Sequence, residues 1–455
     1  MKKSKFLALL LAFAMLLSLA ACGGSGNDAP KDNDASAPGQ ADDAAPGDTS
    51  APDSSDPAGE PSKSVEDSDF FGPIYDEWSD MTDDELYQMA LEEVAQFSGE
   101  DQEINIYATS SKMMKAEEDF EAAYPGLDVT IMDLDQDEVL GKCVLEANSG
   151  NIRGDVLQAK DVNGDVFFNY YEEGYMSAFY PKDISEKIDP MLLRYGYPLY
   201  ASQSFWYYNT EAFPEGQPVN SWWQIIEKNE DGSQKYRLFT KEIGTETAYL
   251  SLFASFIVNV DQMEKAYEDL YGEPLEYTYD GSDFEFEVPE NNAGIEYMWR
   301  FSQMKMTFIG DGDELVKAVD NSTRDDPALA LASGGKIGNR DESGYNIAWL
   351  TNLTPYTGLE NCEYMYVVNN CKHPAAARLF IRWITGGADG ESGGLKPFSK
   401  EGNWPVRNDV EGDWNPVTLA GSGAVGGDLA AINDVFLDTQ DLWIYWLSIS
   451  PNTIG

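Results

Sequence analysis

Two adjacent serines stand between an expected strand and an expected helix. Ser110 and Ser111 follow a strand at 103–108 and precede a helix at about 112–124. Ligands of open α/β sheets bind at the carboxyl ends of strands, next to helix N-termini. Backbone N–H groups and hydroxyls there suit a carboxylate, a phosphate or a sugar hydroxyl. The pair is a candidate ligand-binding segment, and the alternative is that either serine is a plain helix cap.

A second hydroxyl-rich loop precedes the apolar helix expected at 248–258. It reads Gly-Thr-Glu-Thr and offers Thr245 and Thr247 as further candidate ligand-binding residues. Glu246 lies between them. A carboxylate in the binding site would favour a cation or a hydroxyl ligand over a phosphate. If Glu246 is only a first-turn helix acid, that objection does not apply.

An aromatic run lies on the strand region expected at 200–209. Trp206, Tyr207 and Tyr208 are consecutive, and their faces could stack on a sugar ring or enclose a cation. Strand alternation places Tyr207 on the opposite side from the other two. One side should be core, so at most about half of these rings contact a ligand. We take Trp206 and Tyr208 as the candidates.

Two isolated charged residues are weaker candidates. Asp161 follows the third expected strand, at the end where ligands bind. Arg340 lies in a late loop, where it could donate to a ligand or simply be a solvated surface arginine. Together with the serines, the threonines, Glu246 and the two aromatic residues, they complete the predicted binding set.

The chain has few residues that could support catalysis or a metal site. Its single histidine, His373, is expected to cap a helix that begins at Pro374. One histidine excludes most Ser-His-Asp, Cys-His and His-zinc centres unless it serves in one. Paired carboxylates could still cleave glycosides, but 80 acidic residues make such pairs uninformative. The strand expected between Cys362 and Cys371 holds these two too far apart for a disulfide.

The first residues of the chain form a secretory signal. Three lysines within the first five residues precede an apolar stretch at 6–20, followed by Cys22. The stretch is too short to span a bilayer, which takes about 20 residues. Leu-Ala-Ala-Cys resembles the lipobox of bacterial lipoproteins, which implies that 1–22 is a lipoprotein signal peptide and that Cys22 carries the lipid. The alternative is an ordinary signal peptide with a chance cysteine.

Residues 23–66 consist almost entirely of Gly, Ser, Ala, Pro and Asp and contain no aromatic residue. Such a segment cannot bury enough apolar surface to become ordered, so it should be a disordered acidic tether. The whole chain has a formal net charge of −50. This charge excludes nucleic acid as a partner and argues against electrostatic docking on anionic lipid.

Alternating elements predict an α/β fold for the remainder. A capping box at Thr82–Glu85 starts a leader helix within 67–101. Strands expected at 103–108, 127–132 and 155–159 alternate with helices, which indicates parallel βαβ units. The remaining chain is too long for one core and suits two lobes.

Several motifs in order resemble those of the extracellular solute-binding proteins of ABC importers. They are Ile104–Ser111, Phe120–Val129, Gly154–Leu157, Glu172–Met176, Tyr207–Thr210 with Pro218–Trp222, and Tyr366–Ile381. The resemblance covers about 102–410. The branch it resembles most includes ferric-iron binders and some sugar-phosphate or phosphonate binders.

The resemblance implies a two-lobe, type II periplasmic-binding-protein-like α/β fold with a central hinge. Lobe one would comprise 102–200 and about 345–390. Lobe two would comprise 201–344 and about 391–455. The Thr245–Thr247 loop resembles a small-hydroxyl ligand loop of the second lobe. Closure of the hinge on a ligand would present a surface to an ABC permease.

The sequence therefore indicates a monomeric, lipid-anchored receptor for a small polar solute, without cofactor or enzymatic activity. The aromatic strand slightly favours a carbohydrate or sugar derivative. A ferric-iron or other cation receptor is the first alternative, although iron binders of the family carry adjacent tyrosines where 325–344 has none. A surface glycoside hydrolase is the alternative from another class. The protein should be extracytoplasmic, and the acidic tether slightly favours a Gram-positive surface.

Overall fold

A computed structural model describes residues 73–281 and 291–450 of the chain. The predicted signal peptide, Cys22 and the tether at 23–66 lie outside the described residues. All described residues belong to one compact unit. Within it, two separate mixed sheets carry most of the strands.

The first sheet has the strand order β13-β5-β12-β3-β1-β2, with β4 also paired to β12. Its strands are β1 (Ile104–Ala108), β2 (Val129–Asp133), β3 (Val156–Lys160), β4 (Met176–Ser177), β5 (Tyr197–Ser202), β12 (Asn361–Val368) and β13 (Asn403–Pro405). β1 is parallel to both β2 and β3, as the predicted βαβ pattern requires. β12 runs antiparallel to β3 and β5. The carboxyl ends of β1 and β3 therefore lie beside the start of β12.

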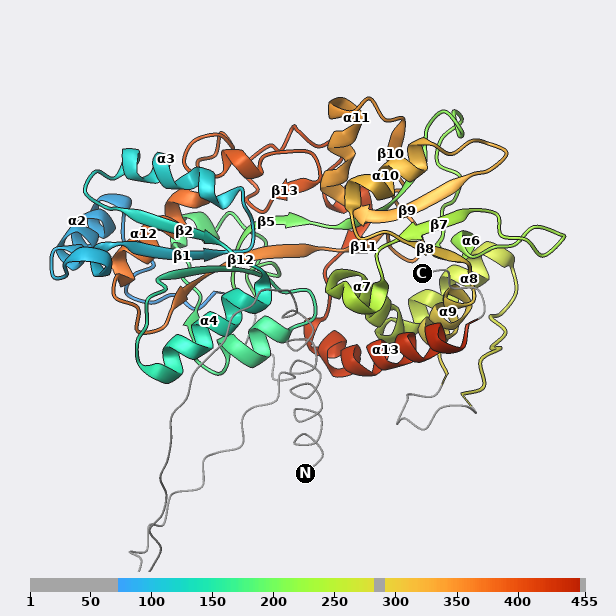
Figure 1. Cartoon of the computed structure of the whole chain (residues 1–455), viewed down its shortest axis with the longest axis horizontal. Helices are drawn as coiled ribbons and strands as arrows, with labels where there is room; N and C mark the ends of the chain where they lie inside the picture. Colours follow the sequence, from blue (N-terminus) through green and yellow to red (C-terminus); the bar gives the residue numbers. More distant parts are fainter. Residues whose placement is uncertain (1–72, 282–290, 451–455) are drawn as a thin grey trace, which may run out of the picture. The chain divides into compact units, whose positions relative to one another are not determined.

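Four main helices pack around this sheet. They are α2 (Asp83–Val94), α3 (Ala116–Ala123), α4 (Gln136–Ser149) and α12 (Pro374–Ile384). α3 and α4 lie on opposite sides of the strands (Figure 1). The leader helix α2 begins at the predicted capping box of Thr82 and Glu85 and packs along α12. Short elements follow: α5 (Lys182–Ser185) and a 3-10 turn, η2 (Met113–Lys115).

The second sheet has the order β10-β6-β9-β7-β8. Its strands are β6 (Ser204–Asn209), β7 (Arg237–Thr240), β8 (Met306–Phe308), β9 (Ala328–Ser333) and β10 (Ile347–Trp349). Its helices are α6 (Trp222–Ile225), α7 (Thr247–Val258), α8 (Val260–Tyr271), α9 (Ala293–Ser302), α10 (Gly312–Asp320), α11 (Asn339–Glu342) and α13 (Leu429–Ile449). α7 is buried along most of its length and packs against α9 and α13 (Figure 1). This burial fixes the position of the hydroxyl loop before α7.

The two sheets are joined where β5 passes into β6 with Gln203 alone between them. A small third sheet pairs β11 (Gly358–Leu359) with β14 (Ala424–Val425). Two strands differ from the predicted lobe boundaries. β10 pairs with β6 in the second sheet, although residues from about 345 were expected in the first lobe. β13 pairs with β5 in the first sheet, although residues beyond about 391 were expected in the second.

Both differences have one cause. The chain passes between the sheets several times near the β5–β6 junction, and strand pairing there is decided by tertiary contacts that no local pattern encodes. The expectation for the cysteines is confirmed, since Cys143, Cys362 and Cys371 are all free thiols. Among the described helices, none is long and apolar enough to cross a membrane.

Candidate ligand-binding site

The Ser110–Ser111 loop lies at the carboxyl end of β1, as predicted. Ser110 is partly buried, and Ser111 is exposed. The carbonyl of Ser110 accepts the N–H of Met113 at 2.9 Å, which starts the turn η2. No serine hydroxyl caps this turn, whose capping position is Lys112. The helix-cap interpretation of the two serines is therefore not what the structure shows, and their role as ligand contacts stays a prediction.

Three lysines converge beside this loop, and sequence reasoning missed them. Lys112 follows the serines directly, and the charge of Lys400 acts on it. Lys160 is the last residue of β3, and its charge also acts on Lys112. Burial, and then the neighbouring charge of Lys400, lower the pKa of Lys112 to about 7. The sequence position of Lys112 and Lys160 could have indicated them, because Lys112 follows β1 and Lys160 ends β3, where ligands bind.

One carboxylate faces the lysines. Glu363 of β12 is 6% exposed, and its Oε1 lies 3.1 Å from Nζ of Lys160. The amide of Gln158 donates to its other oxygen at 3.3 Å. The carboxylate is therefore fully engaged by the first sheet. Lys160 pairs with Glu363 at this edge, and Lys112 and Lys400 add further basic side chains near it.

Lys400 also reaches the second sheet. Its Nζ would lie 3.5 Å from a Cβ placed on Gly335, which follows β9. Its charge contributes to holding the pKa of Asp313 below its usual range, an effect led by the hydrogen bond from Lys336 to Asp313. Arg340, a predicted donor, instead pairs with Glu401 at 2.7 Å, next to Lys400.

The second hydroxyl loop lies after β7, at the carboxyl end of that strand. Thr245 and Thr247 are exposed, and the Thr245 hydroxyl donates to the carbonyl of Glu242 at 3.0 Å. Glu246 forms an ion pair with Lys241 at 2.7 Å. This pairing offsets the negative charge of Glu246, so its presence does not by itself exclude an anionic ligand.

The predicted aromatic contacts are part of the core. Trp206 is completely buried and packs edge-on against Trp222, with ring centroids 6.0 Å apart. Tyr208 is 8% exposed and belongs to the same hydrophobic cluster. Tyr207, on the other face, donates to the carbonyl of Ser333 at 2.8 Å. This burial argues against the stacking role predicted for Trp206 and Tyr208, because neither ring has an exposed face.

Asp161 is also a structural residue. It is 2% exposed, and its carboxylate accepts the N–H of Phe167 at 2.9 Å, at the start of a helical turn. Burial raises its pKa to about 6. This bond engages Oδ2, while Oδ1 is buried and has no hydrogen-bond partner among the described residues.

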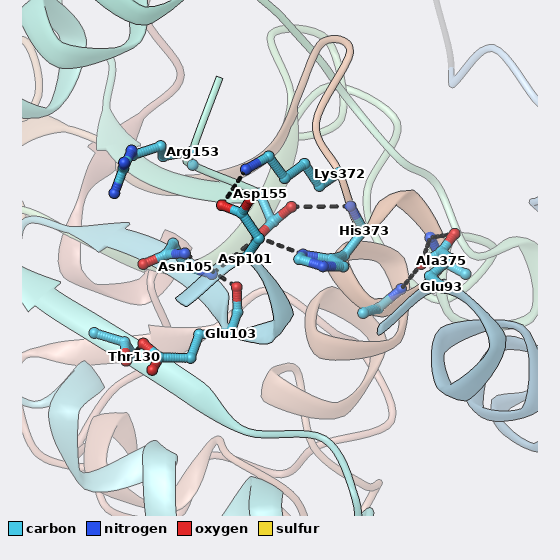
Figure 2. Close-up of polar contacts among 12 residues, drawn as sticks. Glu93, Asp101, Glu103, Asn105, Thr130, Arg153, Asp155, Lys372, His373 and Ala375 are labelled. Atoms are coloured by element: carbon cyan, nitrogen blue, oxygen red, sulfur yellow. Dashed lines mark hydrogen bonds and ion pairs between the residues drawn. The ribbon is translucent and has the colours of Figure 1, made fainter. Parts of the chain in front are cut away.

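The opposite, amino edge of the first sheet holds the histidine (Figure 2). Asp155 accepts the N–H of Asn105 at 2.9 Å and that of His373 at 3.1 Å, and the His373 ring lies 3.2 Å from it. His373 occupies the capping position of α12, but its side chain makes no capping bond. The carboxylate of Glu93, from α2, accepts the N–H groups of Ala375 and Ala376 instead. The prediction that His373 is the cap residue of α12, with Pro374 first in the helix, is confirmed, although the cap is made without the imidazole.

A serine motif near the end of α12 does not form a nucleophile site. Residues 390–394 read Gly-Glu-Ser-Gly-Gly, which matches the Gly-x-Ser-x-Gly pattern of hydrolases. That pattern needs a strand-to-helix turn and a histidine partner. Here Ser392 lies in a loop and donates to Asp389 at 2.8 Å. The part of the chain that the structure describes also holds no group of three His, Cys, Asp or Glu side chains placed for a metal ion.

A family model for bacterial extracellular solute-binding proteins matches residues 102–389. The chain belongs to this family. Its members bind solutes outside the cytoplasm for ABC importers and are typically not enzymes. The match confirms the resemblance and the extracytoplasmic location predicted from the sequence. A search of curated proteins finds no match to this sequence.

Solved structures of similar fold include ferric-iron receptors. Iron-bound HitA from Pseudomonas aeruginosa has a TM-score of 0.53 at 15% identity, covering 76% of this chain and 99% of that one. The apo ferric ion-binding protein A of Pasteurella haemolytica gives 0.53 at 13%, covering 76% and 97%. Trichodesmium IdiA (FutA) with iron and citrate gives 0.51 at 16%, covering 76% and 99%. These likenesses confirm the two-lobe periplasmic-binding-protein-like fold.

Proposed function

We propose that this family member captures a small polar solute between its lobes and delivers it to an ABC permease. The observation that carries the proposal is the placement of the two hydroxyl loops. Ser110–Ser111 follows β1 of the first sheet, and Thr245–Thr247 follows β7 of the second. Both loops lie at carboxyl strand ends, where α/β proteins bind ligands. Closure about the β5–β6 junction would bring both loops onto one solute.

The receptor is held at the membrane by a lipid on Cys22. From its composition, the acidic segment at 23–66 is predicted to act as a tether of about 35–40 Å. That length lets the lobes reach a permease in the same membrane while staying clear of the lipid surface. The acidic composition fits a Gram-positive cell surface better than a periplasm.

A cation is disfavoured as the ligand. The three similar solved structures named above are of iron-binding proteins, but identities of 13–16% transfer the fold alone. The edge of the first sheet beside Ser110 carries Lys112, Lys160 and Lys400 against Glu363. These basic side chains repel a metal ion that would approach this edge. The core position of Trp206 removes the main argument for a plain carbohydrate.

Native mass spectrometry of residues 23–455, purified without refolding, tests the receptor function. We expect a discrete added mass that is lost on denaturation, because receptors with slow dissociation retain their ligand. The released solute should be chemically unchanged after incubation, since no catalysis is proposed. The double variant Ser110→Ala/Ser111→Ala should carry less of it. A released solute that the protein converts to product would contradict the proposal and favour the hydrolase.

If the protein is purified without a bound solute, a thermal-shift panel tests candidate ligands. A true ligand at one hundred times its Kd stabilises the folded state by about 2.7 kcal/mol. Sugars, sugar phosphates, polyamines, carboxylates and ferric iron should be included. If the protein shows no added ligand mass and no compound of the panel shifts its melting temperature, the receptor function is contradicted.

A further inference from the structure

We propose that the amino edge of the first sheet holds a second small-molecule site, which binds a free α-amino acid as a zwitterion. A cavity of about 210 Å³ lies at this edge (Figure 2). Pockets for drug-sized ligands usually measure about 300–1,000 Å³, so this one suits a smaller molecule. It lies at the opposite end of β1 from Ser110, so the proposal is independent of the receptor function above.

Two opposite charges line this cavity without pairing with each other. The carboxylate of Glu103, just before β1, accepts the hydroxyl of Thr130 at 3.0 Å and forms no ion pair with any described residue. The guanidinium of Arg153, just before β3, lies 3.7 Å from the carboxylate of Glu100, which is too far for a hydrogen bond. In the view of Figure 2, the side chain of Asn105 lies between those of Arg153 and Glu103. The cavity therefore has an acceptor on one side and a donor on the other.

The wall between the two charges is fixed by hydrogen bonds. The side-chain amide of Asn105 donates to the carbonyl of Glu103 at 3.0 Å. The backbone N–H of Asn105 donates to Asp155 at 2.9 Å, and Asp155 is 1% exposed. Asp155 also accepts the N–H of His373, another residue that lines the cavity. Because the wall is already ordered, binding does not have to offset the entropy of forming it.

The charge pattern selects a zwitterion. Lys372 and Asp101 also line the cavity, but they pair with each other at 2.5 Å and add no net charge. An α-amino acid would place its ammonium on Oε1 of Glu103 and its carboxylate on the planar fork of Arg153. A simple carboxylic acid would meet the like charge of Glu103, and a simple amine that of Arg153. Met132 offers an apolar wall to the amino-acid side chain.

A metal ion is a weaker candidate for this cavity. Glu100, Asp101 and Glu103 all line it, but no three His, Cys, Asp or Glu side chains of the described residues are placed to hold a metal. Arg153 and Lys372 would also repel a cation. The mixed charges of the lining therefore favour the zwitterion over an ion of either sign.

A thermal-shift screen followed by calorimetry tests the ligand class. Residues 23–455, after extensive dialysis, are screened with each of the standard L-amino acids at millimolar concentration. Isothermal titration then compares the best of them with its deaminated acid and its decarboxylated amine. We expect the amino acid to bind at least about tenfold more tightly than either analogue, the equivalent of one charged hydrogen bond. No shift with any amino acid would overturn the site, and equal binding of either analogue would overturn the zwitterion.

Matched variants assign the two charges. In Glu103→Gln, the amino acid and its deaminated acid should bind equally, because the ammonium has lost its partner. In Arg153→Gln, the amino acid and its decarboxylated amine should bind equally for the corresponding reason. Each change should weaken the amino acid by about tenfold or more. Glu118→Gln and Arg324→Gln remove the same charges from exposed positions outside the cavity and should leave its affinity unchanged. Equal losses in the control variants would mean that net charge alone acts, which overturns the site.

The serine variant separates this site from the proposed receptor site. Ser110→Ala/Ser111→Ala should keep the affinity for the amino acid, and Glu103→Gln should keep any solute mass that native mass spectrometry detects on the receptor. If the serine variant loses the amino acid while Glu103→Gln keeps it, the amino acid is the solute of the receptor site and the second site is overturned. Loss of the amino acid in Glu103→Gln alone supports the second site, whether or not the receptor function holds.

Discussion

The two edges of the first sheet differ in whether their charged side chains have bonded partners. At the amino edge, Asp155 and Glu93 each accept backbone N–H groups, and His373 lies against Asp155 (Figure 2). At the carboxyl edge, burial and then the neighbouring charge of Lys400 lower the pKa of Lys112 to about 7. The first edge satisfies buried polar groups, as a stable fold requires. The second holds a partly buried lysine under the influence of another lysine, which lowers stability.

Removal of Asp155 should have the largest effect on stability. Its carboxylate is 1% exposed and accepts N–H groups from β1 and from the start of α12. Asp155→Ala leaves those donors and the His373 ring without an acceptor, and should lower the free energy of unfolding by about 3–5 kcal/mol. Urea denaturation measures the loss. Asp101→Ala removes a carboxylate from an exposed pair with Lys372 and should change stability by less than about 1 kcal/mol.

If both changes cost the same, the amino edge would owe its stability to surface charge rather than to buried acceptors. Asp155→Asn refines the comparison, because an amide oxygen still accepts one of the two backbone N–H groups. We expect it to lie between wild type and Asp155→Ala.

The leader helix should contribute the next largest effect. The family match begins at residue 102, yet α2 is bonded to α12. Arg382, whose side chain is 9% exposed, pairs with Asp83 at 2.6 Å and with Asp183 at 2.7 Å. Arg382→Met should lower the free energy of unfolding by roughly 2 kcal/mol, since the arginine is buried while its partners are half exposed.

The matched control for this change is an exposed arginine of the second lobe. Arg324 pairs with Glu215 at 2.5 Å, but its side chain is 65% exposed. Arg324→Met should shift stability by less than about 0.5 kcal/mol. A similar loss from both arginines would show that α2 is not anchored through Arg382.

Much of the fold could be predicted because local patterns agree with it. The capping box at Thr82, the stop of α3 before Pro125-Gly126 and the alternation of strands and helices are all encoded in short windows. The pairing of β10 and β13 could not be predicted. Near the β5–β6 junction, contacts between residues far apart in sequence decide which sheet a strand joins.

The candidate site also has residues that the sequence predicts and residues that it does not. Ser110 and Thr245 were predicted because strand-to-helix loops are visible in the sequence. Lys400 was missed, since it comes from a loop nearly three hundred residues from Lys112 and only the tertiary fold brings the two together. Trp206 was overvalued because strand alternation gives two faces without saying which is covered, and here both are.

The smallest effect should be a gain in stability at the carboxyl edge. In the free protein, burial lowers the pKa of Lys112 from 10.5 to about 7. The unfolded chain thus binds more protons between these two values, so stability rises with pH across that window and the penalty is complete below pH 7. Lys112→Met should raise the free energy of unfolding by roughly 1 kcal/mol at pH 6, because the side chain is only partly buried. The gain should shrink as pH rises toward 10. Lys115→Met, which removes the same charge from an exposed position, should show neither the gain nor its pH dependence. A destabilised Lys112→Met would place this lysine with the amino-edge groups that hold the fold together, and the contrast between the two edges would fail.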